Sequence, residues 1–212
     1  RLRTAAVMAV YAVLCALFFA VRYSESYASR RFVVALPTAF ITLAAMTAVR
    51  RGGMAIPAAL AASAVGDLMG AMNLFFGQVG FFAVAHIFFA YDFSRRIRLT
   101  FGRMAVASTS ALAVAAYLAF ILRGIDSRPV SIAVAAYAII IYCMLLAAVV
   151  QSRRRGAWYT AAAVLFVISD GLIAYGIGGG RLPYATVWIM TTYYAAQGIF
   201  ARLFLLRDTP ED

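Results

Sequence analysis

Long apolar segments, separated by short polar connections, run through the whole chain. Eight of them can be marked, at residues 4–21, 32–49, 54–75, 78–93, 101–122, 130–151, 157–177 and 184–206. Most approach the roughly 20 apolar residues that a helix needs to cross a bilayer. They lack the alternating pattern of barrel strands, and only helices and closed barrels satisfy their backbone groups in lipid. The pattern predicts an all-α polytopic membrane protein with eight transmembrane helices.

Composition agrees with this prediction. The 212 residues are 65% hydrophobic and only 13% charged, which is more apolar than a soluble domain tolerates. The connections are too short to hold a soluble domain, so we expect a single membrane domain over residues 1–212. Leu2 to Val21 predicts a first membrane helix rather than a cleaved signal peptide.

The basic residues indicate an orientation. If the N-terminus lies in the cytoplasm, 13 arginines fall on the cytoplasmic side of the membrane and 6 on the other side. The cytoplasmic set is Arg1, Arg3, Arg50, Arg51, Arg95, Arg96, Arg98, Arg103, Arg153, Arg154, Arg155, Arg202 and Arg207; the other is Arg22, Arg30, Arg31, Arg123, Arg128 and Arg181. Both termini are therefore predicted to be cytoplasmic, in a multi-pass protein of a bacterial inner membrane.

Net charge and metal-ligand counts limit the possible partners. A net charge of +11 suggests nucleic acid in a soluble protein, but here the arginines are spread between apolar segments instead of forming one basic arm. We therefore expect no nucleic-acid partner. Two cysteines and one histidine are too few for a cysteine/histidine zinc site, and no metal or cofactor is expected. The oligomeric state is left open.

Two aspartates occupy the interiors of apolar segments. Asp67 lies within residues 55–73 and Asp170 within residues 157–177. Keeping a carboxylate charged at such depth costs about 2.5–3.5 kcal/mol on insertion scales, so intramembrane acids generally serve function. The plainer interpretation is a structural aspartate that accepts a hydrogen bond from a neighbouring helix. If the two carboxylates lie close together, repulsion and desolvation leave one proton shared between them, which suits acid/base catalysis.

Other polar side chains are predicted at the same depth. Each aspartate comes 13 residues after the start of its segment, about 20 Å from the cytoplasmic edge, and His86 lies about 12 Å from the other edge. Tyr193, Tyr194 and Gln197 fall in the same middle band of the last segment. Four helices would then contribute to one polar layer.

Each of these residues has a plainer interpretation. His86 fits a general base, a proton relay or a hydrogen-bonded core residue, and we favour a polar pocket residue. Tyr193 and Gln197 are one helical turn apart, so both can face one pocket. Of Tyr193 and Tyr194, one is expected to serve packing between helices. Asn73 either borders the pocket or caps its helix.

A third aspartate, Asp92, lies at the end of an apolar segment. Asp92 is expected to form a surface ion pair with Arg95 and Arg96, which follow it closely.

The segments at 54–93 and 157–206 share a plan, in which a helix with an aspartate precedes an aromatic-rich helix. This similarity suggests a faint four-plus-four repeat of residues 1–100 and 101–206.

Four stretches together carry a family resemblance. They read SAVGDLMGAMN, VAHIFFAY, LFVISDGLIAY and MTTYYAAQ in chain order. In order and spacing they resemble the YhhN-type lysoplasmalogenases, eight-helix membrane enzymes that hydrolyse the vinyl ether bond of lysoplasmalogen. The resemblance implies that Asp67, His86, Asp170, Tyr193, Tyr194 and Gln197 are motif residues. It also implies a lysophospholipid substrate that yields a fatty aldehyde and glycerophosphoethanolamine or glycerophosphocholine.

One position departs from the family pattern. Many members have a lysine before the proline of the second helix, whereas this chain has Leu36 before Pro37. The resemblance leaves the head group open here, or implies that an arginine such as Arg31 takes the role. Because the lysine is missing, a non-catalytic lipid-binding protein stays an alternative. A proton-coupled small-solute transporter, using the same acids as a relay, is the other.

Overall fold

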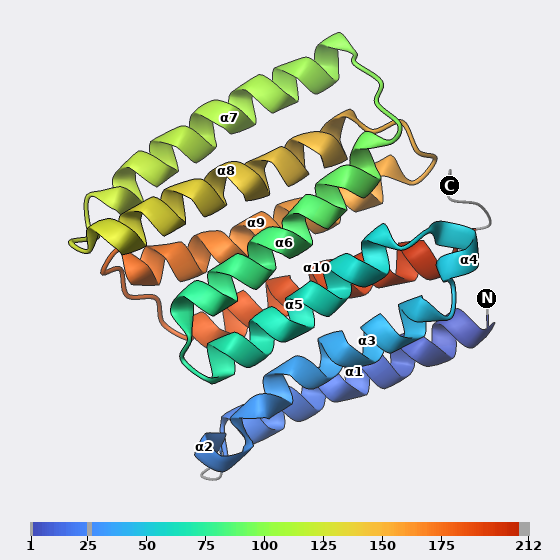
Figure 1. The fold of residues 1–212 in the computed structure, drawn as a ribbon, viewed down its shortest axis with the longest axis horizontal. Coiled ribbons are helices and arrows are strands. Elements are labelled where there is room, and N and C mark those ends of the chain that lie inside the picture. The colour runs from blue at the N-terminus through green and yellow to red at the C-terminus, as the bar shows by residue number, and fades with distance from the viewer. Residues whose placement is uncertain (1, 25–26, 208–212) are drawn as a thin grey trace. The chain divides into compact units, whose positions relative to one another are not determined.

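The computed structural model describes residues 2–24 and 27–207, and over these ranges it is helical (Figure 1). The helices are α1 (Leu2–Arg22), α2 (Tyr27–Arg30), the 3₁₀ helix η1 (Arg31–Ala35), α3 (Leu36–Met46), α4 (Val49–Gly52), α5 (Ala55–Ala71), α6 (Phe75–Ser94), α7 (Phe101–Leu122), α8 (Arg128–Val150), α9 (Gly156–Ile177) and α10 (Ala185–Leu205). The all-α prediction is confirmed for the described ranges.

Five of the described helices are long and apolar enough to cross a membrane: α1, α6, α7, α8 and α9. Residues 31–46 and 55–71 form apolar helices that are shorter. The last helix, α10, is not among the five, and it carries Gln197 and Arg202. The number of spanning helices and the orientation of the termini stay predictions, and Arg1, which was counted for orientation, lies outside the described residues.

Three of the predicted segments differ from the helices of the structure. The second apolar segment, predicted at 32–49, is divided into η1, α3 and α4, with Pro37 in the first turn of α3. Proline is favoured there because the first-turn N–H groups have no partner within the helix. The third segment ends at Ala71 rather than residue 75, and α6 begins at Phe75 rather than residue 78.

Hydrogen bonds at the turn after α5 explain the earlier end. Asn73 adopts a left-handed backbone with φ of 59°. The N–H of Leu74 donates to the carbonyl of Met69 at 2.9 Å, and the N–H of Asn73 donates to Gly70 at 3.0 Å. This pair of bonds is a Schellman cap, in which asparagine tolerates the left-handed position.

The helix that carries the second aspartate ends in the same way. Gly179 has φ of 86°, the N–H of Gly180 donates to Tyr175 at 2.9 Å, and the N–H of Gly179 donates to Gly176 at 3.1 Å. The glycine run at 178–180 therefore caps the C-terminus of α9, and its left-handed position favours glycine.

The chain divides into two compact units, residues 1–89 with 197–212 and residues 90–196. In the first unit, α3 packs against α1 and α5. In the second unit, α7, α8 and α9 pack against one another, and Figure 1 shows them side by side. The boundaries differ from those of the predicted repeat, and both the single membrane domain and the repeat stay predictions.

Candidate functional site

Asp67 lies beside a close helix contact in the first unit. Gly66 and Gly70 are one turn apart on α5, and each faces a side chain of α6. A Cβ on Gly66 would lie 3.0 Å from the ring of Phe82, and a Cβ on Gly70 would lie 2.8 Å from the amide nitrogen of Gln78. Small residues at this spacing let two membrane helices approach closely. Asp67, next to Gly66, is 6% exposed.

His86 follows Gln78 and Phe82 along α6 at intervals of one turn. In the antiparallel contact Gly70 meets Gln78 and Gly66 meets Phe82, so His86 comes level with the turn of α5 that precedes Gly66. Ser63 occupies that turn, and its hydroxyl donates to the carbonyl of Ala59 at 3.0 Å. His86 and Ser63 are both fully buried, so this contact encloses polar groups as well as apolar ones.

Gln197, on α10, is also fully buried. Neither its amide nitrogen nor its amide oxygen has a hydrogen-bond partner within the described residues. Leaving a buried amide unsatisfied costs about 1–3 kcal/mol, so an amide in this state is well suited to receive a polar ligand atom. Asn73, by contrast, is exposed and caps α5.

The second unit gives Asp170 a direct partner. The hydroxyl of Tyr137, on α8, donates a hydrogen bond to the Oδ2 atom of Asp170, on α9. Asp170 is partly exposed. The preceding residue, Ser169, is also fixed by a hydrogen bond, because its hydroxyl donates to the carbonyl of Ile189 at 3.0 Å. The residue after it is Gly171, whose carbonyl accepts a hydrogen bond from Tyr117 at 2.7 Å. Three hydrogen bonds thus fix this turn of α9.

Tyr193 and Tyr194 form an aromatic group with Phe166 in the same unit. The ring centroids of Phe166 and Tyr193 are 5.4 Å apart with an interplanar angle of 86°, an edge-to-face contact. The rings of Tyr193 and Tyr194 are also 5.4 Å apart. Both tyrosines are 3% exposed, which agrees with a large packing role.

The predicted surface position of the Asp92 ion pair was wrong. Its side chain is fully buried and pairs with Arg153, whose Nη1 lies 2.6 Å from Oδ2, while Nη2 donates to the Asp92 carbonyl at 2.8 Å. The Arg153 guanidinium also lies 5.7 Å from the ring centroid of Tyr159. Arg95 and Arg96 are exposed, because they follow the end of α6 at Ser94. Asp92 faces inward on the last turn of that helix and therefore needs a buried partner.

Sequence reasoning missed Tyr137. A signal was present, since Tyr137 is nine residues after the start of α8 and Asp170 seven residues before the end of the antiparallel α9. At 1.5 Å per residue the two positions differ by about 3 Å in depth. The sequence does not show how α8 is rotated about its axis, and this rotation turns the Tyr137 hydroxyl toward α9.

Comparison with known proteins assigns the family. A family model described as the YhhN family matches residues 30–204. The chain belongs to the YhhN family. It is 33% identical over 197 residues to the protein named lysoplasmalogenase TMEM86B of Rattus norvegicus, a match that covers 90% of this chain and 80% of the relative. No solved structure matches.

Two further relatives carry the same name. The Mus musculus protein is 36% identical over 141 residues, covering 66% of this chain and 58% of the relative. The Homo sapiens protein is 37% identical over 100 residues, covering 47% of this chain and 42% of the relative. As a YhhN family member with long apolar helices, the chain is an integral membrane protein.

The geometry of this YhhN chain defines what each unit offers chemically. The first unit holds one carboxylate, Asp67, in a nearly closed helix contact, together with the buried amide of Gln197. The second holds another, Asp170, on a turn fixed by hydrogen bonds and contacted by a tyrosine hydroxyl.

Proposed function

We propose that this chain is a membrane hydrolase that cleaves the vinyl ether bond of lysoplasmalogen. The observation that carries the proposal is the similarity to the rat protein named lysoplasmalogenase, which extends over 90% of this chain. The products would be a fatty aldehyde and glycerophosphoethanolamine or glycerophosphocholine. Family membership and two aspartates within apolar helices support this proposal.

Asp67 and Asp170 would act as an acid/base pair. The protonated carboxyl group donates its proton to the vinyl carbon β to the ether oxygen, and the electrons of the double bond form the new C–H bond. This step leaves an oxocarbenium cation, which the ionised partner stabilises while it accepts a proton from the attacking water. The hemiacetal then breaks its C–O bond and releases the aldehyde and the alcohol. One water is consumed, and the pair regains its proton.

The remaining motif residues would bind the substrate. The buried amide of Gln197 suits a hydroxyl or ether oxygen of the lysolipid, because it has no hydrogen-bond partner among the described residues. His86, Tyr193 and Tyr194 would line the polar layer, and Asn73 would lie at its border. Leu36 is exposed at the start of α3, so Arg31, in the preceding η1, would take the phosphate contact of the family lysine.

The proposed arrangement in the membrane has eight spanning helices and both termini in the cytoplasm, in a bacterial inner membrane. The five long apolar helices support it, as does the 13-to-6 distribution of arginines.

The test is aldehyde release from the purified protein given a lysoplasmalogen. We expect Asp67→Asn and Asp170→Asn each to reduce the rate about a hundredfold or more, because each removes a proton-transfer group. Asp126→Asn changes an exposed aspartate in the α7–α8 connection and should retain the rate of the unaltered protein.

Folded unaltered protein that releases no aldehyde, across head groups and pH values, would contradict the proposed substrate. Proton-linked solute flux in proteoliposomes would then favour the transporter alternative, and lipid binding alone would favour the non-catalytic one.

A further inference from the structure

Two connections of the second unit are joined into one rigid element. Residues 95–100 link α6 to α7, and residues 151–155 link α8 to α9. The N–H of Arg98 donates to the carbonyl of Val150 at 2.8 Å, and the N–H of Ser152 donates to the carbonyl of Arg96 at 2.9 Å. These bonds form an antiparallel bridge between Ile97 and Gln151. We name this element, residues 95–100 and 151–155, the two-loop frame.

Arginine side chains hold the frame from within. The Nη1 atom of Arg103 donates to the carbonyl of Arg98 at 2.8 Å and to that of Val150 at 3.3 Å. Arg153 points inward to the buried Asp92. Breaking such a buried pair costs about 3–5 kcal/mol, so this contact fixes the second connection against the end of α6.

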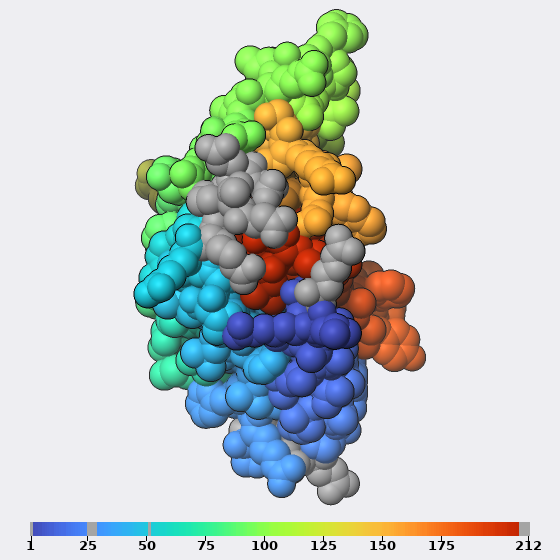
Figure 2. Space-filling model, turned by 90° about the vertical axis from the view of Figure 1, so that its right-hand side faces the viewer, coloured from blue at the N-terminus to red at the C-terminus, as the bar shows by residue number. Residues whose placement is uncertain are grey.

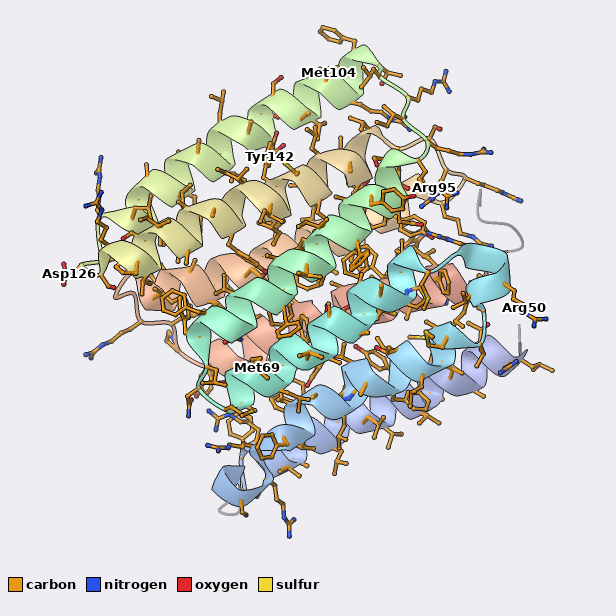
Figure 3. The ribbon with its side chains drawn as sticks, viewed as in Figure 1. Arg50, Met69, Arg95, Met104, Asp126 and Tyr142 are labelled. Atoms are coloured by element: carbon orange, nitrogen blue, oxygen red, sulfur yellow. The ribbon has the colours of Figure 1, made fainter. Side chains whose placement is uncertain are left out.

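Charge on the outside of the frame has one sign. Residues 91–103 and 150–158 contain seven arginines and one acidic residue, and that residue, Asp92, is buried against Arg153. Arg95, Arg98 and Arg154 are exposed. Figure 3 shows Arg95 at the end of α6, near the Met104 end of α7 and away from the Asp126 end. The frame therefore presents guanidinium groups without a neighbouring exposed carboxylate in these stretches.

Apolar side chains surround these charges. Phe101 is 92% exposed, Tyr91 and Trp158 are each 60% exposed, and Leu99 is 65% exposed. In Figure 2 the start of α7, in green, and the start of α9, in orange, both reach the visible face. Aromatic residues beside arginines are typical of the level at which a membrane meets water.

The position of the frame identifies its partner. It lies where α6, α7, α8 and α9 begin or end, and all four are long and apolar enough to cross a membrane. Its arginines are therefore held at the level of lipid head groups. Clusters of four to eight basic residues next to membrane helices typically bind anionic lipids.

We propose that the two-loop frame is a binding site for the head groups of anionic diacyl phospholipids. The phosphate accepts hydrogen bonds from Arg95, Arg98 and Arg154, and the neighbouring aromatic and aliphatic side chains contact the acyl chains. Because hydrogen bonds fix the frame before a lipid arrives, less ordering cost opposes binding. This site does not depend on the proposed hydrolysis, since a diacyl phospholipid has no vinyl ether to cleave.

The test measures binding of phosphatidylglycerol and phosphatidylcholine to the full chain in detergent by native mass spectrometry. The altered protein is Arg95→Gln/Arg98→Gln/Arg154→Gln. The matched control is Arg123→Gln/Arg128→Gln/Arg181→Gln, which removes three exposed arginines from the opposite ends of the same helices. We expect the frame variant to bind phosphatidylglycerol about tenfold more weakly, and the control to bind it as the unaltered protein does. Phosphatidylcholine, whose trimethylammonium group offsets the charge of its phosphate, should bind weakly to all three proteins.

Two further measurements keep the test decisive. The lysine variant, Arg95→Lys/Arg98→Lys/Arg154→Lys, preserves charge and should retain most of the preference even if the glutamine variant does not fold. Raising the salt concentration should weaken phosphatidylglycerol binding to the unaltered protein. Equal loss in the frame and control variants would overturn the proposal. Equal binding of the two lipids, or binding of RNA without phosphatidylglycerol, would overturn it as well.

Discussion

At the scale of single residues, the hydrogen bond between Tyr137 and Asp170 offers the sharpest comparison for the proposed site. The phenolic O–H of Tyr137 donates to the side-chain carboxyl group of Asp170. Five residues further along α8, Tyr142 donates to the carbonyl of Ala107 at 2.7 Å. Figure 3 labels Tyr142 on this helix. Both tyrosines lie on α8 and donate a hydrogen bond, but Tyr137 donates to a side chain and Tyr142 to a backbone carbonyl.

This difference gives a matched pair of substitutions. Tyr137→Phe should lower kcat for aldehyde release about tenfold with little change in KM, because Asp170 loses the donor that orients it. Tyr142→Phe should leave kcat within about twofold while it costs comparable stability. Steady-state kinetics and thermal melting of both variants check this. Equal kcat in the two variants would show that Tyr137 serves packing only.

At the scale of elements, the glycine face of α5 determines where Asp67 lies. A Cβ on Gly66 would lie 3.0 Å from the ring of Phe82, whereas a Cβ on Gly80, on α6, would have nothing within 4 Å. A larger side chain at Gly66 must displace the aromatic ring or separate the helices, and either movement shifts the neighbouring Asp67.

Substitution at the two glycines should therefore have opposite effects. Gly66→Leu should destabilise the protein by about 1–3 kcal/mol through overpacking and reduce aldehyde release. Gly80→Leu should be neutral or slightly stabilising, because leucine favours a helix over glycine. Thermal melting and activity check both variants. Adding Phe82→Ala to Gly66→Leu should recover part of the loss; no recovery would show that the cost arises elsewhere than at this contact.

At the scale of the whole molecule, the charge distribution predicts a testable topology. Ser127 is exposed in the α7–α8 connection, and Ser152 is exposed in the α8–α9 connection. With both termini in the cytoplasm, these connections lie on opposite sides of the membrane. The two-loop frame would then face the cytoplasmic leaflet, which is rich in anionic lipid.

Cysteine labelling in intact cells tests this topology. After replacement of Cys15 and Cys143, an impermeant maleimide should label Ser127→Cys from outside and should label Ser152→Cys only in broken cells. The reverse pattern would invert the orientation. Labelling of both positions from outside would contradict the predicted number of spanning helices between them.

The sequence by itself determined the helices, most of their ends and the family. An apolar segment long enough to cross a bilayer must be helical in lipid, and local chemistry such as the glycines after Ile177 places a helix end. The four motif stretches indicated the family that the comparison then assigned. The two intramembrane aspartates were recognisable as candidates because charge in lipid is costly wherever it occurs.

Only the tertiary structure decided which side chains meet. Asp92 pairs with Arg153, 61 positions away, and Asp170 accepts from Tyr137, 33 positions away. The near neighbours of Asp92 in sequence, Arg95 and Arg96, gave no indication of the distant Arg153. Hydropathy fixes the length of a helix but not its rotation or its neighbours, which depend on close packing between side chains distant in the sequence. The partners of each aspartate therefore follow from packing between helices, which no local pattern encodes.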